Sequence, residues 1–311
     1  MTESPTTGGD YWAESKRPVT ALCFLAPLLI AYEIGAWVSP SDPALRSGVD
    51  ALLRAMLLRL SFGHLWILPA LVAACLIAWQ AGSRQNWKFR LETLGGMFAE
   101  SLVFALLLVI LGQGMHIACR KVGLIETTPP TGESPERWAS DDPQITLAIT
   151  EGGTPAESSV ESVAESQPPI PKAPIAIAPP SEKPLVSRIM GYLGAGIYEE
   201  FVFRLLLLPV LYGGLRVLRW ASAPAAVAAV IVSSVVFAAA HYLPAGEQTL
   251  HIGTLAESMC RVARDQSLWF GFLFRTAAGA VFSSLFVVRG FGVTVGSHAL
   301  YDLIVGVILA A

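Results

Sequence analysis

A succession of long apolar runs is the feature that most constrains the fold of this chain. They cover residues 19–38, 64–79, 91–115, 185–218, 224–243, 268–288 and 291–311. Several of them approach or exceed the roughly 20 residues that an α-helix needs to cross a bilayer. Backbone polar groups in lipid must pair within the chain, so runs of this kind form helices. The sequence therefore predicts an all-α, polytopic membrane bundle.

The composition agrees with a membrane protein surrounded by lipid bilayer. Hydrophobic residues make up 53% of the chain and charged residues only 14%, against about 25% charged in an ordinary soluble domain. The sequence contains no basic patch interleaved with aromatic residues, so it does not indicate a nucleic-acid partner. The four cysteines are scattered and form neither a disulfide framework nor a thiolate zinc site. We expect an integral, multi-pass protein.

Two further segments decide how the chain is divided. Residues 47–60 are apolar but short and basic, so we expect them to lie at the membrane interface; the bundle has seven transmembrane helices, or eight if they cross. Residues 116–184 are polar, acidic and proline-rich, which predicts a disordered linker. We therefore expect a polar tail and three helices in residues 1–115, and a membrane domain with a four-helix core in residues 185–311.

Three charged residues interrupt the apolar run at 185–218, namely Glu199, Glu200 and Arg204. A charge at membrane depth costs about 2.5–3.5 kcal/mol on insertion scales, so such residues usually face a cavity or a partner and have a function. Glu200 and Arg204 are four residues apart and share one helix face. Glu199 is rotated by about 100° from Glu200. We predict that Glu200 pairs with Arg204 and that Glu199 faces a cavity.

The later runs carry further ionisable residues at helical spacing. Phe237 and His241 are four residues apart, and so are His298 and Asp302. If these helices pack together, the carboxylates and histidines converge on a set that suits hydrolysis, which needs a water activated by a general base or by a metal. Two histidines and a carboxylate would also make an open zinc site.

The three motifs in this order resemble those of the CPBP intramembrane proteases, also called the type II CAAX prenyl endopeptidase or Abi family. The family pattern is E-E-x-x-x-R, then F-x-x-x-H, then H-x-x-x-N/D, on successive core helices. The resemblance covers residues 185–311 and implies an intramembrane endopeptidase. Eukaryotic members remove the last three residues of prenylated proteins, and bacterial relatives are linked to bacteriocin maturation or immunity. The implied substrate is a membrane-associated peptide or protein tail, and we expect a bacterial cell membrane as its location.

The resemblance also implies roles for the motif residues. Glu199 would be the general base, helped by His241, while Glu200 and Arg204 would hold the site. His298 and Asp302 would stabilise the oxyanion; in the metal alternative, His241 and His298 would bind zinc. The metal-free glutamate mechanism and the zinc mechanism both stay open. The family's commonest last residue is asparagine, so Asp302 either orients His298, stays protonated or favours a metal.

Two other function classes fit less well. A proton-coupled transporter also uses buried carboxylates and histidines, but transporters often have two related halves, and the halves of this chain differ. A non-catalytic scaffold or immunity protein would not need the complete motif set. The chain contains no H-E-x-x-H or G-x-G-D motif of other intramembrane proteases.

The remaining ionisable residues are expected to be structural. We expect Glu33 and Glu100 to serve packing or to reach the interface, and Arg275 to pair with a buried acid or carbonyl. His64, His116 and His251 are expected to face solvent. One difficulty is that parallel spans would separate Glu199 and His241 by roughly 15–20 Å in depth. The helix that carries His241 must therefore tilt or continue for one site to form.

Overall fold

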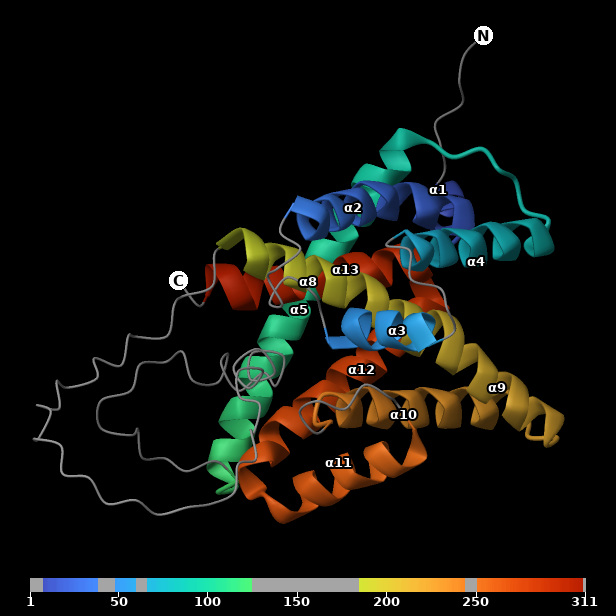
Figure 1. The fold of residues 1–311 in the computed structure, drawn as a ribbon. Helices are drawn as coiled ribbons and strands as arrows, with labels where there is room; N and C mark the ends of the chain where they lie inside the picture. The colour runs from blue at the N-terminus through green and yellow to red at the C-terminus, as the bar shows by residue number, and fades with distance from the viewer. Residues whose placement is uncertain (1–7, 39–47, 60–65, 125–184, 244–250, 310–311) are drawn as a thin grey trace, which may run out of the picture.

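The computed structural model describes residues 8–38, 48–59, 66–124, 185–243 and 251–309. Every regular element in these residues is helical (Figure 1). Most of the predicted linker, from residue 125 onward, lies outside the described residues, as does His64.

The elements fall before and after that segment. The first group comprises α1 (Gly8–Ser15), α2 (Pro18–Val38), α3 (Gly48–Arg59), α4 (Ile67–Ser83) and α5 (Leu91–Lys121). The second group starts with α8 (Leu185–Glu200), the π-helix η2 (Phe201–Leu207), α9 (Leu208–Val217) and α10 (Ser222–Ala240). It ends with α11 (Ile252–Arg264), η3 (Gln266–Leu268), α12 (Trp269–Arg289), α13 (Phe291–Leu303) and the π-helix η4 (Ile304–Ile308).

The predicted polytopic helical bundle is confirmed. Within the described residues, five helical segments are long and apolar enough to cross a membrane: α2, α5, α10, η3 with α12, and α13 with η4. The shorter α4 is also apolar. The α8–η2–α9 segment covers the remaining predicted run. Helix α3, with 12 residues, is too short to cross.

Three details differ from the sequence prediction. Helix α5 continues past the predicted end at residue 115 to Lys121, because no helix breaker intervenes before Gly123, whose φ of 73° is left-handed. The first residues of the predicted linker are therefore helical. Helix α10 ends at Ala240, so that His241 caps it. The run at 185–218 is not one regular α-helix, because η2 interrupts it directly after Glu200.

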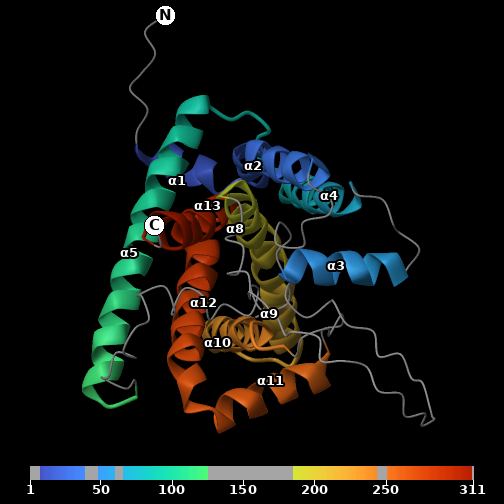
Figure 2. The ribbon, with the colours of Figure 1, turned by 60° about the vertical axis from the view of Figure 1, so that its left-hand side comes forward.

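Helix α13 forms the centre of the bundle. Its residues from Phe291 to Ala299 are all buried, and α2, α5, α8 and α12 pack around it. Figure 2 shows α5 and α12 running alongside each other, with α13 between their upper parts. Small residues allow this close packing: a Cβ at Gly196 of α8 would lie 2.8 Å from the backbone nitrogen of Ala299.

Glu100 has partners that the sequence analysis did not identify. It accepts a hydrogen bond of 2.7 Å from the hydroxyl of Tyr11 and pairs with the buried Arg289. The guanidinium of Arg289 lies 3.7 Å from the ring centroid of Trp12. Burial, followed by the effect of Glu100, raises the pKa of Tyr11 to about 12, so its hydroxyl remains a donor at neutral pH. These contacts fasten α1 to α5 and to the end of α12.

The close contact at Gly196 gives a stability prediction. We expect Gly196→Ala to lower the free energy of unfolding by about 1–3 kcal/mol, because the facing atoms are the backbone and Cβ of Ala299 and cannot move aside easily. Gly114→Ala on α5 is the matched control, since no atom lies within 4 Å of its Cβ position. It should be neutral or stabilising by up to about 1 kcal/mol. Unfolding in detergent would measure both, and equal stability of the two variants would contradict the packing.

Candidate active site

Glu200 and Arg204 form a fully buried ion pair. The Nε atom of Arg204 lies 3.1 Å from Oε2 of Glu200, and Nη2 of Arg204 donates a 3.2 Å hydrogen bond to the carbonyl of Gly279 on α12. The guanidinium also lies over the Phe237 ring, 4.3 Å from its centroid. Arg204 thus joins η2 to α10 and α12, and the predicted pairing with Glu200 is present.

The second oxygen of Glu200 holds His298. Its Oε1 atom accepts a 2.7 Å hydrogen bond from Nδ1 of His298. The imidazole stacks on the Phe282 ring at a centroid distance of 4.6 Å and an angle of 18°. Glu200 therefore fixes both the position and the orientation of His298, so its role is wider than the pairing with Arg204.

Glu199 points to the other side and meets both histidines. Its Oε2 atom lies 3.6 Å from Nε2 of His241 and 3.9 Å from Nε2 of His298. Nδ1 of His241 lies 2.8 Å from the carbonyl oxygen of Phe237. A carbonyl only accepts, so Nδ1 carries the proton and the neutral ring presents an acceptor at Nε2. Glu199 and His241 thus present two acceptors to the same small space.

Asp302 lies at the edge of this group. Its Oδ2 atom is 3.4 Å from Nε2 of His298, and its side chain is 19% exposed. Nδ1 of His298 donates to Glu200 the hydrogen bond that orients the ring, whereas Asp302 approaches the opposite nitrogen. Carboxylates on both sides favour the doubly protonated ring, which donates from both nitrogens.

One partly open cavity of about 330 Å³ contains the catalytic candidates. Glu199, His241, His298 and Asp302 line it, whereas Glu200 and Arg204 lie behind its wall. Aromatic side chains form much of the remaining surface: Tyr192, Phe237, Tyr242, Phe270, Phe274, Phe282 and Tyr301. An apolar cavity with a few convergent polar groups is the usual form of a ligand site.

Glu199 and His241 meet, although parallel helices would hold them at different depths. Figures 1 and 2 show α10 lying across α12 and not alongside it. Because α10 crosses α12, its C-terminal cap His241 lies close to Glu199, and α10 does not have to continue beyond His241.

Two cavity residues were not predicted for the site. His116 was expected to face solvent, but it lines the cavity and its ring centroid lies 5.4 Å from that of Phe270. Arg275 also lines the cavity and donates a 3.1 Å hydrogen bond to the hydroxyl of Tyr242. The extended α5 brings His116 here, and no local sequence pattern indicates this position. His251 is exposed, as expected, and caps α11 by accepting a hydrogen bond from the Thr254 backbone.

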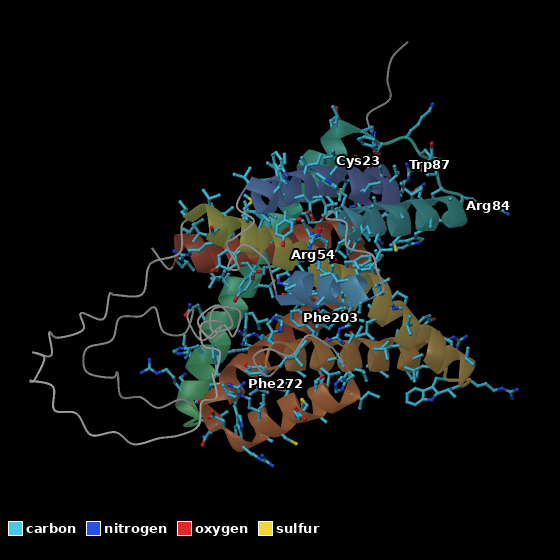
Figure 3. The ribbon with its side chains drawn as sticks, in the orientation of Figure 1. Cys23, Arg54, Arg84, Trp87, Phe203 and Phe272 are labelled. Carbon is cyan, nitrogen blue, oxygen red and sulfur yellow. The ribbon has the colours of Figure 1, made fainter. Side chains whose placement is uncertain are left out.

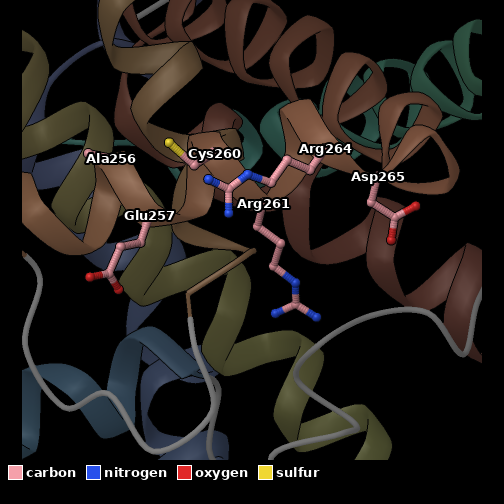
Figure 4. A pocket seen from close by; sticks show the side chains of 6 residues that line it. All are labelled: Ala256, Glu257, Cys260, Arg261, Arg264 and Asp265. Carbon is pink, nitrogen blue, oxygen red and sulfur yellow. The ribbon is translucent and has the colours of Figure 1, made fainter.

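A second hollow, of about 540 Å³, lies on the outer face of α11 and is open to the surface. Figure 4 shows its side chains Glu257, Arg261 and Asp265 pointing away from one another. It contains none of the predicted site residues. We therefore assign the candidate active site to the cavity at Glu199.

The donor set does not match a metal site as it stands. In the part of the chain that the structure describes, no group of three or more His, Cys, Asp or Glu side chains is arranged to hold a metal ion. Zinc would need ligand atoms about 2.0–2.2 Å from its centre; Nε2 of His241 and Nε2 of His298, which both face Glu199, are the nitrogens that could bind it.

The Glu200–Arg204 pair gives a second stability prediction. We expect Arg204→Met to cost about 3–5 kcal/mol, because it removes one partner of a buried ion pair. Arg216→Met, at an exposed position further along the same helix, should change stability by less than about 0.5 kcal/mol. Thermal unfolding of both variants would test this. A similar loss in the two would show that the ion pair contributes nothing particular.

Comparison with known proteins agrees with the motifs. A family model described as type II CAAX prenyl endopeptidase Rce1-like matches residues 181–304. No curated protein and no solved structure matches the chain. The matched segment contains Glu199, Glu200, Arg204, His241, His298 and Asp302 and includes the cavity walls from α8 to α13. Residues 181–304 of this integral membrane protein are therefore a domain of the type II CAAX prenyl endopeptidase family.

Proposed function

We propose that this protein is an intramembrane endopeptidase that cleaves a membrane-associated peptide or protein tail in a bacterial cell membrane. The observation that carries the proposal is the approach of one Glu199 oxygen to Nε2 of both His241 and His298 inside one cavity. The family match supports peptide hydrolysis as the reaction class. The substrate's identity is left to experiment.

The geometry supports a glutamate-activated water. The gaps of 3.6 Å and 3.9 Å around Glu199 are too long for direct hydrogen bonds. A water held between Glu199 and His241 can donate to both acceptors. Glu199 takes one proton as the water oxygen attacks the scissile carbonyl carbon. This forms the C–O bond of a tetrahedral intermediate.

The remaining groups complete the reaction. A doubly protonated His298 donates from Nε2 to the developing oxyanion, while Glu200 receives its Nδ1 hydrogen bond. Asp302 beside Nε2 supports the charge of the ring and takes no part as a donor. When the C–N bond breaks, the proton held by Glu199 passes to the leaving amine, directly or through His241. The products are a new carboxylate and a free amine.

Substitution of the proposed base tests this function. In reconstituted membranes we expect Glu199→Gln to slow peptide cleavage by about 10²–10⁴-fold, because the amide cannot accept the water proton. Glu92→Gln, at an exposed position in the first turn of α5, should leave the rate unchanged. Cleavage by Glu199→Gln at the rate of Glu92→Gln would rule out Glu199 as the base. Absence of cleavage by the unaltered protein would favour the transporter or scaffold alternatives.

The metal alternative has its own test. We expect the purified protein to contain far less than one zinc ion per chain and to keep its activity in the presence of a chelator, because no three-donor group is in place. Elemental analysis together with the cleavage assay measures this. Stoichiometric zinc, lost together with activity and restored with it, would replace the glutamate mechanism by one in which His241 and His298 bind the ion.

A further inference from the structure

A second buried polar cluster adjoins the candidate site from the opposite side of α8. We call Tyr32, Glu33, Asp50, Arg54 and Tyr198 the front cluster, since four of its members lie on α2 and α3. Arg54 bridges Glu33 and Asp50 at 2.8 Å and 2.6 Å and is labelled in Figure 3. Glu33 was expected to serve packing or to reach the interface, and its partners Arg54 and Tyr198 were not predicted. The interfacial position expected for residues 47–60 stays a prediction; helix α3 contributes Asp50 and Arg54 to the cluster.

The two tyrosines of the front cluster donate hydrogen bonds to its two carboxylates. The hydroxyl of Tyr198 donates a 2.6 Å hydrogen bond to Glu33, and that of Tyr32 donates one of 2.7 Å to Asp50. Both tyrosines, Glu33 and Asp50 are at most 1% exposed. Hydrogen bonds to ionised groups in such surroundings are short and strong. The cluster is therefore a firm attachment between α2, α3 and α8.

The front cluster holds Tyr198, the residue next to Glu199 on α8. Successive side chains of a helix are about 100° apart, and each of these three has a different environment. Tyr198 is held by Glu33, Glu199 faces the cavity, and Glu200 is held by Arg204 and His298. Contacts on both neighbours fix the rotation of α8 and so the direction of the Glu199 side chain.

The backbone needs such contacts at this place. The π-helix η2 starts at Phe201, one residue after Glu200. A π-helix changes the hydrogen-bond spacing from four residues to five, so the regular α-helical ladder does not continue through the site. Contacts before and after the change of spacing determine where the Glu199 carboxylate lies.

We propose that Tyr198 is a positioning residue that, through Glu33 and Arg54, holds the Glu199 carboxylate against His241 and His298. The inference rests on the proposed function. It assigns a part in catalysis to Glu33 and Arg54, which lie outside the family-matched residues 181–304. The first half of the chain then helps to shape the active site.

The chain offers a matched pair of variants. Tyr198→Phe removes the hydroxyl that donates to Glu33, which pairs with Arg54. Tyr11→Phe removes the hydroxyl that donates to Glu100, which pairs with Arg289. A displacement of about 1 Å at a reacting group can cost roughly 100-fold in rate. In the reconstituted full chain we expect Tyr198→Phe to lower kcat at least about 10-fold with KM within about two-fold. Tyr11→Phe should change neither by more than about two-fold.

A second measurement does not depend on activity. Backbone hydrogen exchange in Phe201–Leu207 should become faster in Tyr198→Phe and stay at the wild-type rate in Tyr11→Phe. Glu33→Gln, which keeps an acceptor for Tyr198 but loses the charge pair with Arg54, should show a smaller change in the same direction. It replaces Tyr198→Phe if that variant does not fold.

The outcomes are separable. Unchanged exchange in Phe201–Leu207 overturns the proposal, and so does a loss of kcat no greater than that of Tyr11→Phe. If the unaltered protein cleaves no peptide, the proposed function fails, and the exchange comparison alone decides whether Tyr198 positions Glu199.

Discussion

The carboxylate of Glu200 is the group on which the rest of the site depends. It is fully buried, one oxygen pairs with Arg204 and the other accepts the hydrogen bond of His298. A charge inside a membrane protein is tolerated only with such partners. Because these partners lie on η2 and α13, and Arg204 reaches on to α12, one acid fixes the relative positions of three helical segments. Glu199, on the neighbouring position of the helix, lines the cavity.

The two halves of the chain meet at the same helix. The family match begins at residue 181, yet α2 and α3 hold α8 through Tyr198, and α5 supplies His116 to the cavity. Intramembrane sites of this kind need rigid surroundings because a displaced carboxylate is a poor base. Helices α2, α3 and α5 therefore form part of the surroundings of the candidate site.

Local spacing explains which features could be predicted. The apolar runs gave the helices, and the four-residue interval gave the pairing of Glu200 with Arg204 and the separate direction of Glu199. The catalytic roles of Glu199, His241 and His298 stay predictions. The π-helix after Glu200, the inclination of α10 and the pairing of Glu33 with Arg54 depend on contacts between helices far apart in sequence. Periodic patterns in the sequence do not indicate such contacts. The approach of His241 to Glu199 and the position of His116 could therefore be seen only in the fold.

The most direct test of the central claim is cleavage of a membrane-anchored peptide in water labelled with oxygen-18, by the reconstituted wild type and by Glu199→Gln. The account predicts that the wild type releases a product whose new carboxylate carries the label, and that Glu199→Gln releases almost none in the same time. Labelled product from Glu199→Gln at the wild-type rate would contradict activation of the water by Glu199.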